Sequence, residues 1–271
     1  MKKYKLLKKS KIEFRGKTLF QIQALKDFGY ISEGEKGGFV ESEVNLSQEG
    51  DSWVGGDARV GGDARISDNA RVSSSARVFG SARVGGDAWI KGDAWIKGDA
   101  WVSGDAIVDG NAWIKGDAWI KGDACVSGGA VVDGNAMVFD NAIVFGDARV
   151  SGDALVSGDA RISGNARVGG DAWITSDACV SGGAVVDGNA MVFDRARVFG
   201  DARVSGDALV LGDAWVSGDA IVDGDAWVSG DARVFGNARI SGKARVSGKA
   251  RIEGDENIES NKSSGGTPAP L

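Results

Sequence analysis

The sequence predicts an all-β protein, most of which is a solenoid: a coil of short parallel strands with a small β cap at its N-terminal end. A six-residue phrase repeats from Val54 to Arg251 without insertion or deletion, in 33 copies. Two of its positions are nearly constant, and a longer identical repeat gives the length of one coil. The length alone suggests one or two domains. In a repeat array, however, each unit contacts only its neighbours and the array extends in one dimension, so the repeat predicts a single elongated array instead.

The phrase itself predicts short strands joined by corners. Its first position is Val or Ile in every copy, its fifth is Ala, and Gly-Asp most often lies between them. Across each phrase boundary the order Ala, variable, Val or Ile, variable gives a four-residue strand with two residues facing in and two facing out. Gly can take the positive φ of a corner, and Asp or Asn can bond to nearby backbone.

An internal duplication predicts the period of the coil. The segment Asp123–Asp140 recurs unchanged as Asp177–Asp194, nine phrases further along the chain. Nine phrases are three sets of three, as expected if three phrases form one triangular coil. The array then forms about 11 coils, each rising about 4.8 Å. Each coil buries three Val or Ile side chains, each worth about 1.5–3 kcal/mol before the entropy cost is subtracted.

Residues 1–47 are predicted to be an N-terminal capping segment. Lys3–Leu7 and Thr18–Leu25 have the pattern of two short strands, with a turn at Arg15-Gly16 between them. A helix over Gln21–Phe28 is the competing local prediction, and the glycines of Lys26–Val44 indicate a loop. An apolar set too small for a core of its own is expected to cover the first coil, because the end of a solenoid exposes apolar side chains and strand edges: Leu6, Leu7, Phe14, Leu19, Phe20, Ile22, Phe28 and Phe39.

The remaining chain divides into the array and a tail. The hexapeptide-repeat domain is predicted over residues 48–257, because the phrase weakens after Arg251. Residues 258–271 are rich in Ser, Gly, Pro, Asn and Lys, a composition typical of disordered segments. The sequence therefore predicts a disordered C-terminal tail.

Composition excludes several classes of function. The net charge of −6 and the pI near 4.9 argue against nucleic-acid binding, which usually needs a basic surface. There is no His, and the two cysteines, Cys125 and Cys179, lie three coils apart, too far for a disulfide. No metal site and no cofactor are predicted, and the aligned corner carboxylates are attributed to turn chemistry rather than to calcium binding. No signal peptide or membrane span is apparent, so a cytoplasmic protein without membrane contact is expected.

The phrase resembles that of the hexapeptide-repeat proteins, with an aliphatic residue followed four places later by a small one. This resemblance implies a left-handed parallel β-helix, assembly commonly into trimers, and in many members acyl transfer from coenzyme A or acyl carrier protein. The head segment, with Ile22-Gln23-Ala24-Leu25 and Gly37-Gly38-Phe39-Val40, also resembles uncharacterised bacterial and phage hexapeptide-repeat proteins. The general base of the acyltransferases is usually a His on an inserted loop. This chain has no His, and its array has no inserted loop, so no catalytic residue is predicted and acyl transfer is kept only as an alternative.

The outward positions carry the functional signal. When the chain is folded in sets of 18, the residues just before the inward Val or Ile fall into three columns, which contain all nine Trp. One of them has eight consecutive apolar members between Arg83 and Arg245, and we call these eight the apolar column: Trp101, Trp119, Met137, Leu155, Trp173, Met191, Leu209 and Trp227. Beside them on the same strands lie Phe139, Phe193 and Leu211.

The apolar column predicts an interface. Scattered Trp residues suit strands in any case, but an uninterrupted exposed apolar stripe usually marks an interaction surface, and Trp and Met are enriched in such surfaces. We expect a non-catalytic structural or interaction module: a rigid β-helical rod that forms homo-oligomers side by side through this face or end to end, or that binds another protein. A carbohydrate-binding surface built on the Trp ladders is a further alternative.

Overall fold

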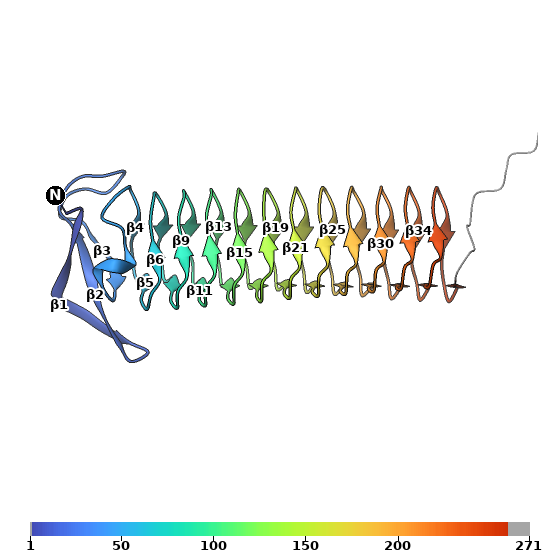
Figure 1. The fold of residues 1–271 in the computed structure, drawn as a ribbon, viewed down its shortest axis with the longest axis horizontal. Coiled ribbons are helices and arrows are strands. Elements are labelled where there is room, and N and C mark those ends of the chain that lie inside the picture. The colour runs from blue at the N-terminus through green and yellow to red at the C-terminus, as the bar shows by residue number, and fades with distance from the viewer. Residues whose placement is uncertain (1, 260–271) are drawn as a thin grey trace, which may run out of the picture. The chain divides into compact units, whose positions relative to one another are not determined.

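The computed structural model describes residues 2–259, so all but two residues of the predicted tail lie outside the described residues. The chain divides into two compact units, residues 1–135 and 136–271. Each contains a parallel β-solenoid, and the first also carries an antiparallel cap (Figure 1). The solenoid has about 12 turns with the predicted spacing of 18 residues. The prediction of an all-β parallel solenoid with an N-terminal β cap is therefore confirmed. Within residues 2–259 no helix is long and apolar enough to cross a membrane.

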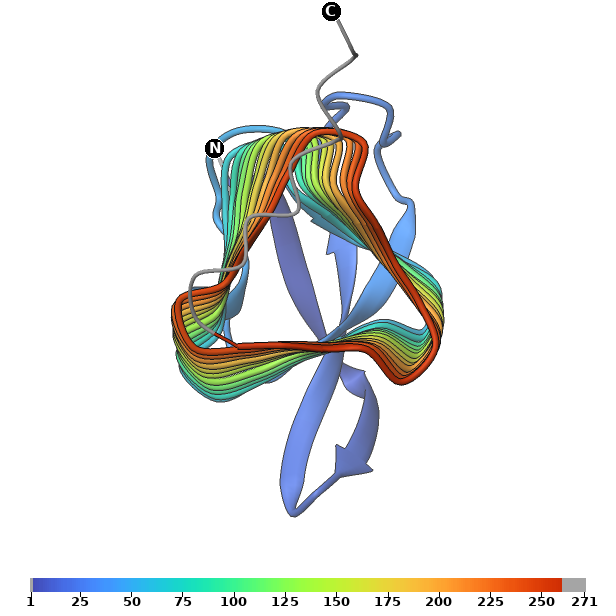
Figure 2. The same ribbon diagram turned by 90° about the vertical axis from the view of Figure 1, so that its right-hand side faces the viewer.

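Each turn of the coil has three sides (Figure 2), and strands one turn apart stack in parallel into three faces. In the first unit, face 1 consists of β4 (Trp53–Val54), β7 (Arg71–Val72), β10 (Trp89–Ile90), β13 (Ile107–Val108) and β16 (Cys125–Val126). Face 2 consists of β5 (Arg59–Val60), β8 (Arg77–Val78), β11 (Trp95–Ile96), β14 (Trp113–Ile114) and β17 (Val131–Val132). Face 3 consists of β6 (Arg65–Ile66), β9 (Arg83–Val84), β12 (Trp101–Val102) and β15 (Trp119–Ile120).

The second unit repeats this arrangement. Its face 1 consists of β19 (Ile143–Val144), β22 (Arg161–Ile162), β25 (Cys179–Val180), β28 (Arg197–Val198), β31 (Trp215–Val216), β34 (Arg233–Val234) and β37 (Arg251–Ile252). Its face 2 consists of β20 (Arg149–Val150), β23 (Arg167–Val168), β26 (Val185–Val186), β29 (Arg203–Val204), β32 (Ile221–Val222), β35 (Arg239–Ile240) and β38 (Asn257–Ile258). Its face 3 consists of β18 (Met137–Val138), β21 (Leu155–Val156), β24 (Trp173–Ile174), β27 (Met191–Val192), β30 (Leu209–Val210), β33 (Trp227–Val228) and β36 (Arg245–Val246).

The strands of the array have two residues each, not the predicted four. The inter-coil hydrogen bonds still span the predicted stretch, since Arg59 N–H donates to Ala76 O over 2.9 Å and Gly61 N–H to Val78 O over 3.0 Å. The N–H of the inward Ala, however, does not bond to the next coil. In the phrase that begins at Val54, Ala58 N–H instead donates to Gly55 O over 3.3 Å, and this hydrogen bond closes the corner. The corner therefore takes the first and the last residue of each predicted strand.

The corners explain the third and fourth positions of the phrase. The third position has positive φ throughout, and it is Gly except at Asp68, Ser74, Asp140, Ser176 and Asp194. Asp tolerates this conformation better than most residues, and here its carboxylate also bonds to the next coil: Gly86 N–H donates to Asp68 Oδ2 over 2.9 Å. At the fourth position an Asn amide donates to the Asp one coil on, as in Asn69 Nδ2 to Asp87 Oδ1 at 2.8 Å. Asn for Asp thus converts a like-charge contact between coils into a hydrogen bond.

The core is the line of inward side chains. The inward Val and Ile residues from Val54 to Val246 are at most 1% exposed, and the inward Ala residues from Ala58 to Ala244 are fully buried. Alternation of a small and a branched residue fills the narrow interior, and burial of each aliphatic side chain contributes about 1.5–3 kcal/mol. This core holds the outward residues at fixed positions on the three faces.

The cap is a three-stranded sheet that continues face 2. β1 (Tyr4–Phe14) and β2 (Lys17–Ala24) form an antiparallel hairpin, and β2 pairs with β3 (Lys36–Val40). β3 then pairs in parallel with β5, which puts Val40 beside Val60. The two predicted strands and their turn are present, but β1 runs to Phe14, well past the predicted end at Leu7. The alternative helix over Gln21–Phe28 is wrong, and the predicted loop over Lys26–Val44 contains β3 and the short 3-10 helix η1 (Glu43–Asn45).

The cap also pairs the open edge of the first coil, as predicted for a solenoid end. The Asn45 side chain donates to Gly62 O and Ala64 O, each over 2.9 Å, and Ser47 N–H donates to Ile66 O over 2.8 Å. Of the apolar residues expected to cover the coil, Leu19 and Ile22 are fully buried. The others, including Phe14 and Phe28, are half-buried.

A lysine is buried in the cap. The Lys3 side chain is 1% exposed, and its ammonium donates to Ser52 O over 2.9 Å and to Glu49 O over 3.3 Å. Burial lowers the pKa of Lys3 from 10.5 to about 8. The neighbouring Tyr4 hydroxyl donates to Leu46 O over 2.7 Å, and burial raises the pKa of Tyr4 above its ordinary range, as it does for Tyr30.

These pKa shifts predict a stability maximum at alkaline pH. Above pH 8 the folded state loses the Lys3 proton while the unfolded chain keeps it to about 10.5, so the free energy of unfolding rises with pH in this window. Above about pH 10 the unfolded tyrosines ionise first, and stability falls. Urea denaturation between pH 7.5 and 10.5 should show the rise and then the fall. Lys3→Met should abolish the rise and keep the fall; a rise that persists in this variant would contradict the assignment.

Candidate functional site

The first unit contains the first two members of the apolar column. Trp101 on β12 and Trp119 on β15 are paired in register, and their rings meet edge to face with centroids 5.3 Å apart. They are 40% and 44% exposed, although each precedes a fully buried residue. Arg83 lies one strand before them, on β9.

The second unit holds the other six members, on β18, β21, β24, β27, β30 and β33. Consecutive members are paired in register from Met137 through to Trp227. Trp173 is 49% exposed and Trp227 43% exposed, while Leu155 and Leu209 are half-buried between larger neighbours. The ladder ends at Arg245, whose guanidinium lies 4.8 Å from the centre of the Trp227 ring.

Three further predicted residues lie beside this ladder on face 3. Phe139, Phe193 and Leu211 are all half-buried. Their backbone N–H groups donate to the inward Val one coil on, for example Phe139 to Val156 O over 2.9 Å. They widen the apolar surface at three levels of the second unit. The structure thus places all of the predicted interface residues of this unit on one face.

The other two faces are interrupted by charge. In the second unit, face 2 carries outward Arg149, Arg167, Arg203 and Arg239, and face 1 carries Arg161, Arg197, Arg233 and Arg251. The two cysteines lie on face 1, and both are free and half-buried. Within residues 2–259 no group of three or more His, Cys, Asp or Glu side chains is arranged to hold a metal ion.

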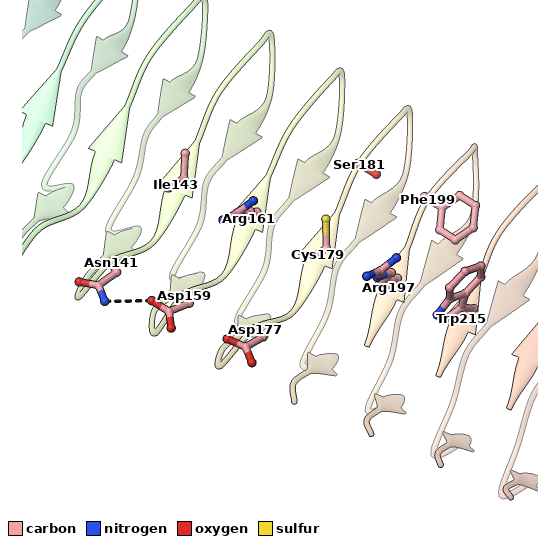
Figure 3. Close-up of a pocket in the computed structure, with 10 residues that line it drawn as sticks. All are labelled: Asn141, Ile143, Asp159, Arg161, Asp177, Cys179, Ser181, Arg197, Phe199 and Trp215. Atoms are coloured by element: carbon pink, nitrogen blue, oxygen red, sulfur yellow. Dashed lines mark hydrogen bonds between the residues drawn. The ribbon is translucent and has the colours of Figure 1, made fainter. Parts of the chain in front are cut away.

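Face 1 of the second unit also has a groove that the sequence did not predict (Figure 3). Its volume is about 800 Å³. Cys179 lies between Arg161 and Arg197 on successive strands, so a small side chain separates two long ones and leaves the surface hollow. Phe199 and Trp215 form one end, with ring centroids 5.9 Å apart. The only sequence signal was the small residue among large ones in this column.

The charges of the groove are arranged in two rows. The corner residues Asp159 and Asp177 line one side, where Asn141 Nδ2 donates to Asp159 Oδ1 over 2.9 Å, and the arginines lie on the strands. A second hollow of about 560 Å³ continues past Arg197 and Trp215 toward Arg233. This arrangement suits a polar ligand that carries both charges, but it contains no His and offers no cysteine paired with a base.

The coil and the repeat together define the class of protein: the chain is a β-solenoid protein built from six-residue repeats. Its repeats match the model of the YdcK beta solenoid repeat at residues 64–80, 160–175, 196–212, 202–218 and 232–248. A comparison with curated proteins gave no match.

Solved structures with a similar coil include two acyltransferases. The UDP-N-acetylglucosamine acyltransferase of Francisella novicida has 17% sequence identity and a TM-score of 0.34, with 60% of this chain and 62% of that chain covered. The UDP-N-acetylglucosamine O-acyltransferase (LpxA) of Moraxella catarrhalis has 14% identity and a TM-score of 0.31, with 66% and 70% covered. The chain thus spans less than two thirds of the length of the Francisella enzyme.

Proposed function

We propose that this protein is a non-catalytic interaction module, a rigid solenoid that self-associates side by side through the apolar column. The observation that carries the proposal is the ladder on face 3, in which six consecutive outward residues of the second unit are apolar and in register. Residues 1–47 would act as the cap of this module and residues 48–257 as its array. The function is then to hold copies of the chain in a fixed geometry.

A second copy fits this surface because the spacing matches. The rungs of a parallel ladder are about 4.8 Å apart, and a second copy presents rungs with the same spacing. A large side chain such as Trp173 can then pack against a smaller one such as Leu155 or Leu209 of the other copy. A partner with another fold would match the period at only one or two levels.

Charge also favours face 3. Two copies that met through face 2 would bring Arg149, Arg167 and Arg203 against the same residues of the other copy. Contact through face 1 would likewise bring the arginines of that face together. Burial of unpaired guanidinium groups is costly. On face 3 of the second unit the first outward Arg is Arg245, at the end of the ladder. Side-by-side packing is also the assembly that the family resemblance implies.

The proposal predicts that charges placed on face 3 separate the copies. We expect Trp119→Glu with Leu155→Glu to convert an oligomer into a monomer in sedimentation equilibrium, because the introduced carboxylates would be buried without partners. The matched control is Trp113→Glu with Val131→Glu, which also replaces one Trp and one aliphatic outward residue by Glu, but on face 2. The control should keep the wild-type mass, and both variants should keep the wild-type far-ultraviolet circular dichroism.

Two outcomes would overturn the proposal. One is a wild-type protein that stays monomeric at high micromolar concentration. The other is an oligomer that loses mass equally in the face 2 control. A shift of the melting temperature by coenzyme A or an acyl-coenzyme A would instead support acyl transfer, with the groove of face 1 as the place to look for the donor.

A further inference from the structure

A pocket in the first unit lies between the turn of the cap hairpin and face 2 of the array. Its volume is about 320 Å³, near the lower end of the range for small-molecule sites. The hairpin contributes Phe14 and Arg15, and the array contributes Arg77, Phe79 and Trp95. The sequence did not predict this site, because the two parts are far apart in the chain and only the folded hairpin brings them together.

Specific contacts hold the hairpin turn over the array. Lys17 forms an ion pair with Glu41 at 2.8 Å, and Glu41 Oε2 also accepts a hydrogen bond from Gly62 N–H over 2.6 Å. The Phe14 ring packs on Phe79 with centroids 5.3 Å apart. Gly61 makes room for this packing, since a Cβ there would lie only 2.8 Å from the Phe79 ring. The pocket is therefore a built feature of the cap and not a gap beside a loose turn.

The pocket has an excess of positive charge. The Arg15 guanidinium lies 4.2 Å from the centre of the Trp95 ring, and that of Arg77 lies 5.3 Å from it. Within residues 2–259 neither arginine forms an ion pair, whereas Lys17 is paired with Glu41. Lys97 also lines the pocket, and Asp63 is its one acidic residue. The guanidinium groups of Arg15 and Arg77 thus lie over one indole, and Asp63 is the only acidic side chain that lines the pocket with them.

The pocket also has donors without acceptors. Arg77 Nε and Trp95 Nε1 are buried and find no acceptor among the described residues. Buried N–H groups in native proteins are nearly always paired, and a group that no protein atom satisfies calls for another explanation. Both side chains line the same pocket, and both donate only. Trp53 Nε1 and Arg59 Nε are in the same situation outside the pocket, so the excess of positive charge is what favours a ligand with acceptors and negative charge here.

We propose that this pocket binds a small organic anion. Its carboxylate or phosphate oxygens would accept hydrogen bonds from the guanidinium groups of Arg15 and Arg77, and its apolar or aromatic body would pack on Phe14 and Phe79. Arginine and indole donors in an apolar setting favour such a group, because charge-assisted hydrogen bonds strengthen where water is excluded. This site is independent of the apolar column, and it lies on a different face.

Calorimetric titration of the full chain with benzoate, adenosine monophosphate and inorganic phosphate tests the proposal. We expect benzoate or adenosine monophosphate to bind with micromolar to submillimolar affinity and inorganic phosphate to bind at least tenfold more weakly, since it has no apolar body. A preference for benzoate would assign a carboxylate ligand, and a preference for the nucleotide a phosphate ligand. Arg77→Gln should weaken binding at least tenfold. Trp95→Phe, which shrinks the ring over which both guanidinium groups lie, should weaken it about threefold.

Matched controls separate the site from general charge effects. Arg83→Gln on β9 and Trp89→Phe on β10 make the same changes away from the pocket, and binding should stay within twofold of wild type. Arg15→Gln, in the exposed hairpin turn, keeps the test valid if Arg77→Gln disturbs the fold, and it should also lose at least threefold. Absence of binding by both organic probes at millimolar concentration would overturn the proposal, as would binding that survives both arginine substitutions unchanged.

Discussion

Replacement of Ile120 by Ala is expected to lower the free energy of unfolding by about 2–5 kcal/mol. Ile120 is fully buried and points into the coil, where it is paired in register with Val102 one strand away. The substitution removes three carbon atoms from an interior that is one side chain deep. Neighbouring coils are held at the strand spacing by backbone hydrogen bonds, so the walls cannot move in to fill the cavity.

The residue just before it supplies the matched control. Trp119 is larger than Ile120 but 44% exposed, and its truncation to Ala removes the buried part of the ring and the edge-to-face contact with Trp101 without opening a cavity in the interior. The ring contact contributes about 0.5–1.5 kcal/mol beyond the area that the ring buries. Guanidinium denaturation followed by far-ultraviolet circular dichroism compares the two variants under conditions in which the chain is monomeric. A cost below about 1 kcal/mol for Ile120→Ala would contradict its assignment as an inward position at this rung.

The array could be predicted from the sequence because its interactions are local in the repeat. Each inward position needs an apolar side chain of one size, so Val or Ile recurs at one position and Ala at the other. The shift between the two copies of the duplicated segment gives the coil length. The in-register pairing of Trp101 with Trp119, three phrases further on, confirms that length. The grouping of outward residues into faces follows from the same period. The boundaries of the strands did not follow, because hydrogen bonding by Ala58 N–H to Gly55 O decides where a corner ends.

The cap and its pocket could not be predicted to the same extent. β3 includes Gly37 and Gly38, which argue against a strand by local propensity. Both are buried against the first coil, where a Cβ on Gly38 would lie 2.6 Å from Ala58 O, so the close approach requires glycine. Similarly, nothing in the local sequence places Arg15 over Trp95. These features depend on contacts between distant segments, which a repeat pattern does not encode.

The second large effect is expected at the corners, where Gly104→Ala should cost about 2–3 kcal/mol of unfolding free energy. Gly104 has a φ of +74°, a conformation that costs a residue with a Cβ about 1–2 kcal/mol. An added Cβ would also lie 2.8 Å from Gly122 N and 2.9 Å from Gly122 O, one coil on. Because these contacts are with backbone, they can be relieved only by a shift of the corner itself.

Two further variants, Gly248→Ala and Gly104→Asp, separate the cost of the positive φ from the cost of the contact between coils. Gly248 occupies the same position of the phrase with a φ of +67°, but a Cβ there would meet nothing within 4 Å, so Gly248→Ala should cost about 1 kcal/mol from the backbone conformation alone. Gly104→Asp should cost less than Gly104→Ala, because the carboxylate can accept a hydrogen bond from Gly122 N–H as Asp68 does from Gly86 N–H at 2.9 Å. Equal losses for Ala at the two glycines would show that the contact between coils carries no cost. Equal losses for Asp and Ala at position 104 would contradict the hydrogen-bond explanation of Asp68, Asp140 and Asp194. Those three aspartates would then occur at this position only because Asp tolerates positive φ.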